Sequence, residues 1–146
     1  MKKFCFISIL LFSSFMIWTS FLYASEKVGS VSTKGLLLKD KIEVYAFDDP
    51  DIKGITCYTT YYKRGSLNPF KEDSSSVSLS CAKTGKIEGT PSDRENVFSQ
   101  KKNIFFKKTL VSRLYDKNRN VLIYLTYTKA TSGENFSHSI SVVPLN

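Results

Sequence analysis

Alternation of apolar and polar residues with a period of two is the feature that most constrains this fold. The segment VSLSCAK places Val77, Leu79 and Cys81 on one face and serines on the other. ITCYTTYYK (55–63) is rich in threonine and tyrosine, which favour strands, and IEVYAF (42–47) alternates in the same way. Because a period of two is typical of half-buried strands, the chain is predicted to be mainly β.

The C-terminal part of the chain contains the strongest hairpin pattern. In LVSRLYDKNRNVLIYLTYTK (110–129), two apolar strands flank the polar turn sequence DKNRN. The second strand is apolar on both faces, which predicts a position inside a sheet. SISVVPL (139–145) is predicted to be the last strand, with Pro144 ending it or marking an edge.

Helix patterns are weak by comparison. LLLKDK (36–41) and PSDRENVFSQ (91–100) are the two segments with the character of a short helix. KRGSLNPFKEDSSS (63–76) and KTGKIEGTPSD (83–93) are predicted to be loops from their glycine, proline and serine content. We therefore predict one compact antiparallel β-sandwich or small barrel-like domain with one or two short helices.

The N-terminus has the pattern of an export signal. Lys2 and Lys3 precede an uncharged run from Phe4 to Ala24, which ends in small residues. We predict a cleaved signal peptide over residues 1–25 and a single domain over 26–146; an uncleaved membrane anchor is the alternative. The formal charge falls from +8 to +6 on cleavage, which is too small to indicate nucleic acid as a partner.

Two cysteines remain after the predicted cleavage site. Cys57 and Cys81 lie on apolar faces of predicted strands, and an even pair in an oxidising compartment favours a structural disulfide. The C-x-x-C spacing of redox-active pairs is absent, although free or redox-active thiols remain the alternative.

The sequence FDDPD is the main candidate for chemistry. Asp49 and Pro50 fit the first two positions of a type I turn. On this interpretation Asp48, Asp49 and Asp51 are solvated, and the Asp49 side chain caps free N–H groups of the turn. The alternatives are a divalent-cation site and catalytic carboxylates at Asp48, Asp49 and Asp51. An EF-hand alignment fails, because Lys53 takes a ligand position and Thr60 stands where a glutamate is needed.

Basic residues are concentrated between residues 101 and 119, around Phe105 and Phe106. The candidate surface for an anionic partner consists of Lys107, Lys108, Arg113, Lys117 and Arg119. For an exported protein, anionic lipid or polysaccharide is the expected partner rather than nucleic acid. The interpretation that the pattern favours is an ordinary solvated sheet face with the phenylalanines pointing inward, partly neutralised by the acidic segment 40–51.

Other residues carry weaker indications. His138 is the only histidine and is expected to be exposed near a strand edge, because no nucleophile elbow accompanies it. NFS at Asn135 matches a glycosylation sequon, a pattern that is common by chance. No P-loop, dinucleotide-binding or zinc-protease motif occurs, so we expect no cofactor.

Several segments together resemble the CreA family of small exported bacterial proteins. They are VGSVST (28–33), IEVYAFDDPDIKGITCY (42–58), VSLSC (77–81), LYDKNRNVLIYLTYT (114–128) and SISVVPL (139–145). The loop KRGSLNPFKED and the short C-terminal tail depart from the family pattern. The resemblance implies a periplasmic location in a Gram-negative envelope and transfers no catalytic role.

Two classes of function follow from these observations. The first is a non-catalytic binding or accessory module whose partner is an envelope protein or an anionic envelope surface. On this hypothesis membrane contact comes only through an uncleaved leader. The second is an enzyme that uses Asp48, Asp49 or Asp51, with a divalent cation; the lack of a second histidine favours the first.

Overall fold

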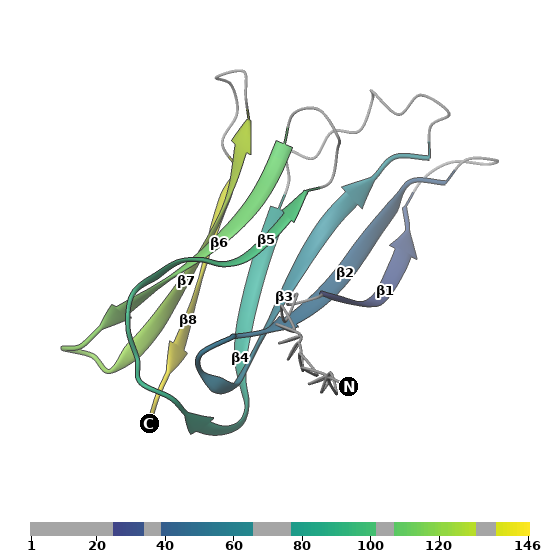
Figure 1. Ribbon diagram of the computed structural model, residues 1–146. Coiled ribbons are helices and arrows are strands. Elements are labelled where there is room, and N and C mark those ends of the chain that lie inside the picture. Colours follow the sequence, from purple (N-terminus) through teal and green to yellow (C-terminus); the bar gives the residue numbers. More distant parts are fainter. Residues whose placement is uncertain (1–24, 34–38, 66–76, 102–106, 131–136) are drawn as a thin grey trace, which may run out of the picture.

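Eight strands form two four-stranded antiparallel sheets that pack together (Figure 1). The computed structural model describes residues 25–33, 39–65, 77–101, 107–130 and 137–146. The first sheet has the order β1 (Glu26–Ser32), β2 (Lys41–Asp48), β3 (Lys53–Lys63), β4 (Val77–Glu88). The second has the order β5 (Arg94–Lys101), β6 (Lys107–Asp116), β7 (Val121–Ala130), β8 (His138–Pro144). The predicted antiparallel sandwich is confirmed.

The antiparallel order gives the sandwich two ends with different connections. At the turn end, β2 joins β3, β4 joins β5 and β6 joins β7, whereas the other four connections start and finish at the opposite end. In Figure 1 the turn end lies towards the bottom and the opposite end towards the top. We call the opposite end the lysine end, after the lysines within two residues of its strand termini: Lys41, Lys63, Lys101, Lys107, Lys108 and Lys129.

The apolar core lies between the sheets and nearer the turn end. The rings of Phe47 on β2 and Phe98 on β5 stack at a centroid distance of 4.2 Å, which joins the two sheets. The buried cluster consists of Phe47, Ile52, Ile55, Cys57, Leu79, Cys81, Val97, Phe98, Val111, Leu122, Tyr124 and Val143. Burial of these side chains is the main force that holds the sheets together.

Towards the lysine end, most of the inward positions carry hydroxyl groups instead. The buried residues there include Thr59, Tyr61, Thr109, Thr126 and Thr128, together with Glu43 and the apolar Val77. The threonines and Tyr61 continue the inward faces of β3, β6 and β7 beyond the apolar cluster. The interior therefore becomes more polar along the strands towards the lysine end.

Two serine side chains, one on β8 and one just before it, accept hydrogen bonds from the edge of β4. The hydroxyl oxygen of Ser141 accepts a hydrogen bond from the backbone N–H of Cys81 at 2.8 Å. Ser137, just before β8, accepts one from the N–H of Val77 at 3.3 Å. These bonds give the edge amides of β4 partners without a backbone ladder.

Several sequence predictions can be compared with these strands. The hairpin is confirmed as β6 and β7, with β7 between two neighbours, and β8 ends at Pro144. Asp116 Oδ1 accepts hydrogen bonds from the N–H groups of Asn118 and Arg119, which fixes the DKNRN turn.

Two predictions about the region after Cys81 are wrong. PSDRENVFSQ was predicted to be a short helix, but its residues from Arg94 onwards form β5. A register irregularity between Arg94 and Phe98 allows the consecutive residues Val97 and Phe98 both to be buried. KTGKIEG was predicted to be a loop, but β4 continues to Glu88 because it still pairs with β3 there.

Two predicted segments lie partly outside the described residues. Of LLLKDK, residues 36–38 are not described and Lys41 begins β2; of KRGSLNPFKEDSSS, residues 66–76 are not described. No helix within the described ranges is long and apolar enough to cross a membrane.

Candidate functional site

The DDPD sequence forms the turn between β2 and β3. Asp49 Oδ1 accepts hydrogen bonds from the backbone N–H groups of Asp51 at 2.9 Å and Ile52 at 3.0 Å. This capping of the turn by Asp49 was expected from the sequence. Gly54 completes the turn with a φ of +79°, and a Cβ atom there would lie 2.4 Å from the carbonyl oxygen of Lys86. The turn therefore requires glycine.

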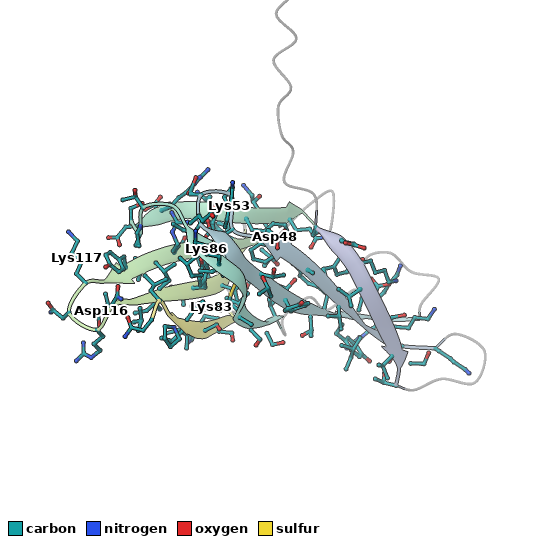
Figure 2. The ribbon with its side chains drawn as sticks, turned by 90° about the horizontal axis from the view of Figure 1, so that it is seen from below. Asp48, Lys53, Lys83, Lys86, Asp116 and Lys117 are labelled. Carbon is teal, nitrogen blue, oxygen red and sulfur yellow. A yellow bond between two sulfur atoms is a disulfide. The ribbon has the colours of Figure 1, made fainter. Side chains whose placement is uncertain are left out.

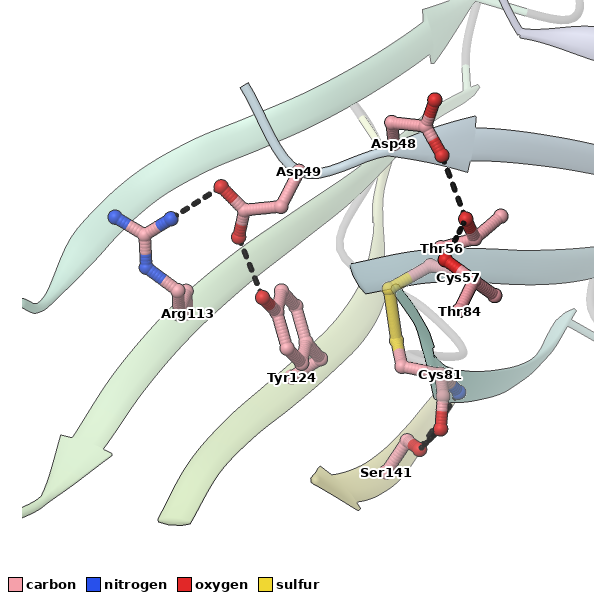
Figure 3. The surroundings of a disulfide bond; sticks show 9 residues. All are labelled: Asp48, Asp49, Thr56, Cys57, Cys81, Thr84, Arg113, Tyr124 and Ser141. Carbon is pink, nitrogen blue, oxygen red and sulfur yellow. Dashed lines mark hydrogen bonds and ion pairs between the residues drawn. A yellow bond between two sulfur atoms is a disulfide. The ribbon is translucent and has the colours of Figure 1, made fainter. Parts of the chain in front are cut away.

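Asp49 also forms a buried ion pair with the second sheet. Its Oδ1 accepts a hydrogen bond from Arg113 Nη1 at 2.5 Å, and its Oδ2 accepts one from the Tyr124 hydroxyl at 2.5 Å. The side chains of Asp49 and Arg113 are both fully buried. Figure 3 shows Arg113 and Tyr124 converging on the carboxylate from β6 and β7. The turn of one sheet is thus fastened to the middle strands of the other.

Asp51 extends this pair to the surface. Its Oδ2 accepts from Arg113 Nη2 at 2.9 Å, and its Oδ1 is paired with Arg94. Partial burial alone would raise the pKa of Asp51, but the hydrogen bonds from Arg94 and Arg113 outweigh it and lower that pKa. The third nitrogen of the Arg113 guanidinium, Nε, donates a hydrogen bond to the carbonyl oxygen of Ser92 at 2.9 Å.

Asp48, in contrast, points outwards. Its Oδ1 accepts a hydrogen bond from the Thr56 hydroxyl at 2.6 Å, and Thr56 lies 2.9 Å from the hydroxyl of Thr84 (Figure 3). All three of these residues form a polar row on the outer face of the first sheet. Asp48 therefore fits the predicted solvated position.

The interpretation of Asp49 as a solvated turn residue is wrong. Its burial follows from Arg113, which lies 64 positions away on the inward face of β6. An unpaired buried guanidinium would be very unfavourable, so the carboxylate must accompany it into the core. Within the described ranges, no group of three or more His, Cys, Asp or Glu side chains is arranged to hold a metal ion.

The two cysteines form a disulfide between β3 and β4. Cys57 and Cys81 are directly opposite each other in the register, with an S–S distance of 2.08 Å. Both belong to the apolar core, and the backbone of Cys81 is the point where Ser141 joins the sheets (Figure 3). The predicted pairing is confirmed, and it lies inside the core.

A second polar cluster lies on the inward face of β2. Glu43 is 7% exposed; its Oε1 accepts a hydrogen bond from Lys27 Nζ at 2.6 Å, and its Oε2 accepts one from the Tyr45 hydroxyl at 3.0 Å. The hydrogen bond from Lys27 lowers the pKa of Glu43, with a smaller contribution from the charge of Lys63.

The predicted basic residues do not share one surface. Arg113 is buried, and Lys117 and Arg119 lie in the β6–β7 turn, where Arg119 pairs with Asp116 at 2.8 Å. Lys107 and Lys108 stand at the other end of β6. Because β6 has ten residues, about 30 Å of strand separates the two groups.

His138 is exposed at the start of β8, as expected from the sequence. The neighbouring Ser137 is engaged in the β4–β8 contact, since its hydroxyl accepts from Val77 and its N–H donates to Thr128 Oγ1 at 3.2 Å.

Sequence reasoning missed the contributions of Tyr124 and Ser141. One signal was present, because Arg113 shares the inward face of β6 with Thr109 and Val111. An arginine on a buried face requires a carboxylate partner, and the acidic segment 40–51 supplies it. No local pattern identifies Ser141, whose partner is 60 positions away.

Comparison with known proteins now identifies the family. The family model described as CreA protein matches residues 28–146. The chain belongs to the CreA family. Protein CreA of Escherichia coli strain K12 is 37% identical over 134 residues, which covers 83% of this chain and 84% of that relative. Protein CreA of E. coli O6:H1 and of E. coli O157:H7 give the same values.

The match to CreA covers all eight strands except the first two residues of β1. It includes the DDPD turn, both cysteines and the arginine and tyrosine that enclose Asp49. The descriptions of these relatives name no activity or ligand. No solved structure gives a significant match.

Proposed function

We propose that this CreA-family protein is exported to the periplasm and acts there as a non-catalytic binding or accessory module. The observation that carries the proposal is the arrangement of the three aspartates. Asp49 is enclosed by Arg113, Tyr124 and two backbone N–H groups, so both of its oxygens already have protein donors. A substrate or cation would have to displace a buried arginine to reach it.

The alternative is an enzyme that uses Asp48, Asp49 or Asp51, with a divalent cation. Asp51 is held by two arginines, whose positive charges oppose the approach of a cation. Asp48 has one oxygen bonded to Thr56, and its neighbours in that row are hydroxyl groups. The geometry therefore favours the binding module.

Export is supported by two features. A disulfide in the core is typical of oxidising compartments, and lysines followed by an uncharged run begin the sequence. β1 begins at Glu26, so removal of residues 1–25 as a signal peptide would leave all eight strands of the proposed single domain, 26–146, complete.

Osmotic-shock fractionation followed by N-terminal sequencing tests the location. The released chain is expected to begin at Ser25 or Glu26. Recovery of the intact chain in the membrane pellet would show an uncleaved anchor instead, and recovery in the cytoplasm would contradict the proposal. Single alanine variants of Asp48, Asp49 and Asp51 test the enzymatic alternative. If a catalytic activity is found for the wild type, the variants should lose it at equal folded fraction only if these carboxylates are catalytic.

A further inference from the structure

The strand termini at the lysine end concentrate positive charge. The two terminal residues of every strand at this end include six lysines and no carboxylate, a formal charge of +6. The same positions at the turn end hold three basic and five acidic residues, a formal charge of −2. The positive charge of the strands is thus gathered at one end.

The register places these lysines directly opposite one another. Lys41 on β2 is the partner of Lys63 on β3, and Lys108 on β6 is the partner of both Lys101 on β5 and Lys129 on β7. Like charges at directly opposed positions destabilise a sheet. Both sheets therefore carry an arrangement that opposes folding, at the same end of the molecule.

Within the described ranges, ion pairs do not relieve this repulsion, although the charge of Lys63 also acts on Glu43. Among the described residues, no ion pair involves Lys41, Lys63, Lys108 or Lys129. The turn end shows the contrast, because its own opposed pair, Arg94 and Arg113, is neutralised by Asp49 and Asp51. The arginines at the turn end are therefore paired with carboxylates, whereas the opposed lysines are not.

We propose that the lysine end is a docking surface for an anionic lipid membrane. Its cations are spread over the ends of both sheets. Such an array fits a broad plane of negative charge better than one small anion. Lysines are compact point charges, suited to a fluid set of headgroups, whereas bidentate recognition of a single phosphate favours arginine.

This proposal deepens the binding role proposed above by naming its partner as an anionic bilayer surface. It also replaces the candidate surface expected from the sequence. Lys108 and Lys107 stay in the surface, whereas Arg113, Lys117 and Arg119 are excluded by burial or by their place at the turn end.

Co-sedimentation with vesicles tests the proposal directly. The purified exported protein is mixed at low ionic strength with vesicles of equal parts phosphatidylglycerol and phosphatidylcholine, and with pure phosphatidylcholine vesicles. The neutral vesicles report any binding through a retained leader. We expect binding to the anionic vesicles only, and its loss at high salt.

Two matched variants locate the surface. The lysine-end variant carries Lys41→Gln, Lys63→Gln, Lys108→Gln and Lys129→Gln. The control carries Lys53→Gln, Lys83→Gln, Lys86→Gln and Lys117→Gln, at residues that Figure 2 shows near Asp48 and Asp116 on the turn end. Both variants lose four charges. The lysine-end variant is expected to lose on the order of several hundredfold in partition coefficient, and the control less than about tenfold.

Equal losses in the two variants would overturn the proposal, because net charge alone would then explain binding. Lack of binding to anionic vesicles would also overturn it, as would tighter binding to a single-stranded oligonucleotide or an acidic polypeptide. Saturation by free glycerol phosphate at millimolar concentration would indicate a small-anion site and would contradict a membrane surface. None of these results depends on where the protein resides, so failure here is distinguishable from failure of the export proposal.

Discussion

The two ends of this sandwich differ in whether their cationic side chains are paired with carboxylates. At the turn end, Arg113 is buried and each of its three guanidinium nitrogens donates a hydrogen bond, to Asp49, Asp51 or Ser92. At the lysine end, cations face one another across both sheets without carboxylate partners among the described residues. Pairing of Arg113 with carboxylates indicates that it stabilises the fold. Opposed lysines without ion-pair partners destabilise the fold, which indicates that they serve binding instead.

The interior of the sandwich changes in the same direction. The apolar cluster, the disulfide and the Phe47–Phe98 stack lie nearer the turn end. Towards the lysine end, threonine and tyrosine take most of the inward positions. We therefore expect most of the free energy of unfolding to be lost through substitutions at the turn end.

Removal of Arg113 should have the largest effect. Arg113→Ala leaves the Asp49 carboxylate buried without its cation, which costs about 3–5 kcal/mol of unfolding free energy. Urea unfolding followed by circular dichroism measures it. Asp48→Ala is the control, because its exposed side chain should cost less than about 0.5 kcal/mol. A cost below 1 kcal/mol for Arg113→Ala would show that the ion pair does not hold the sheets together.

Loss of the disulfide should come next. The bridge closes a loop with a sequence separation of 24 residues, and the double variant Cys57→Ala, Cys81→Ala should lose about 3–4 kcal/mol in the chain-entropy model. Thiol labelling of the native protein is expected to find no free cysteine in the mature chain. Two reactive thiols in the folded protein would contradict the structural role of the bridge.

Substitution of Glu43 should lower the unfolding free energy by a smaller amount, and this loss should depend on pH. Its pKa is lowered in the fold by Lys27, so its contribution is complete above the unfolded pKa of about 4.3 and is lost as the pH falls through the lower folded value. Glu43→Gln should cost about 1 kcal/mol at pH 7. The unfolding free energy of the variant should fall less steeply below pH 4 than that of the wild type. Parallel pH curves would contradict this origin.

The smallest effect should have the opposite sign. Lys41→Gln removes one of two opposed lysines and should raise the unfolding free energy by about 0.2–1 kcal/mol at low ionic strength. High salt should abolish the gain, since it screens exposed charges. A loss of stability would mean that Lys41 stabilises the fold, and would weaken the distinction between the two ends.

The sequence predicted the strands better than it predicted the environment of the aspartates. Val77, Leu79 and Cys81 alternate regularly, so their buried face was evident, and the DKNRN turn has strong local signals. The helix predicted near Arg94 failed because β5 is fixed by pairing with β6 and by the contact of Phe98 with Phe47. Those interactions are long-range and leave no periodic pattern in the segment.

The candidate site shows the same limit. The capping of the turn by Asp49 depends on neighbours two and three positions away and was therefore predictable. Its burial depends on Arg113 and Tyr124, at separations of 64 and 75 residues. A strand pattern gives the face on which Arg113 lies, but only the packing of the two sheets places that face against the turn.

The most direct test of the central claim is urea unfolding of the wild type and Asp49→Asn, each with magnesium, calcium, zinc or manganese and each with chelator. If the carboxylate serves the fold, the wild type has the same unfolding free energy in every condition. Asp49→Asn should then lose about 3 kcal/mol in all of them. A wild type that gains stability with one cation, together with an Asp49→Asn variant that lacks the gain and loses little in chelator, would contradict the claim and show a metal site instead.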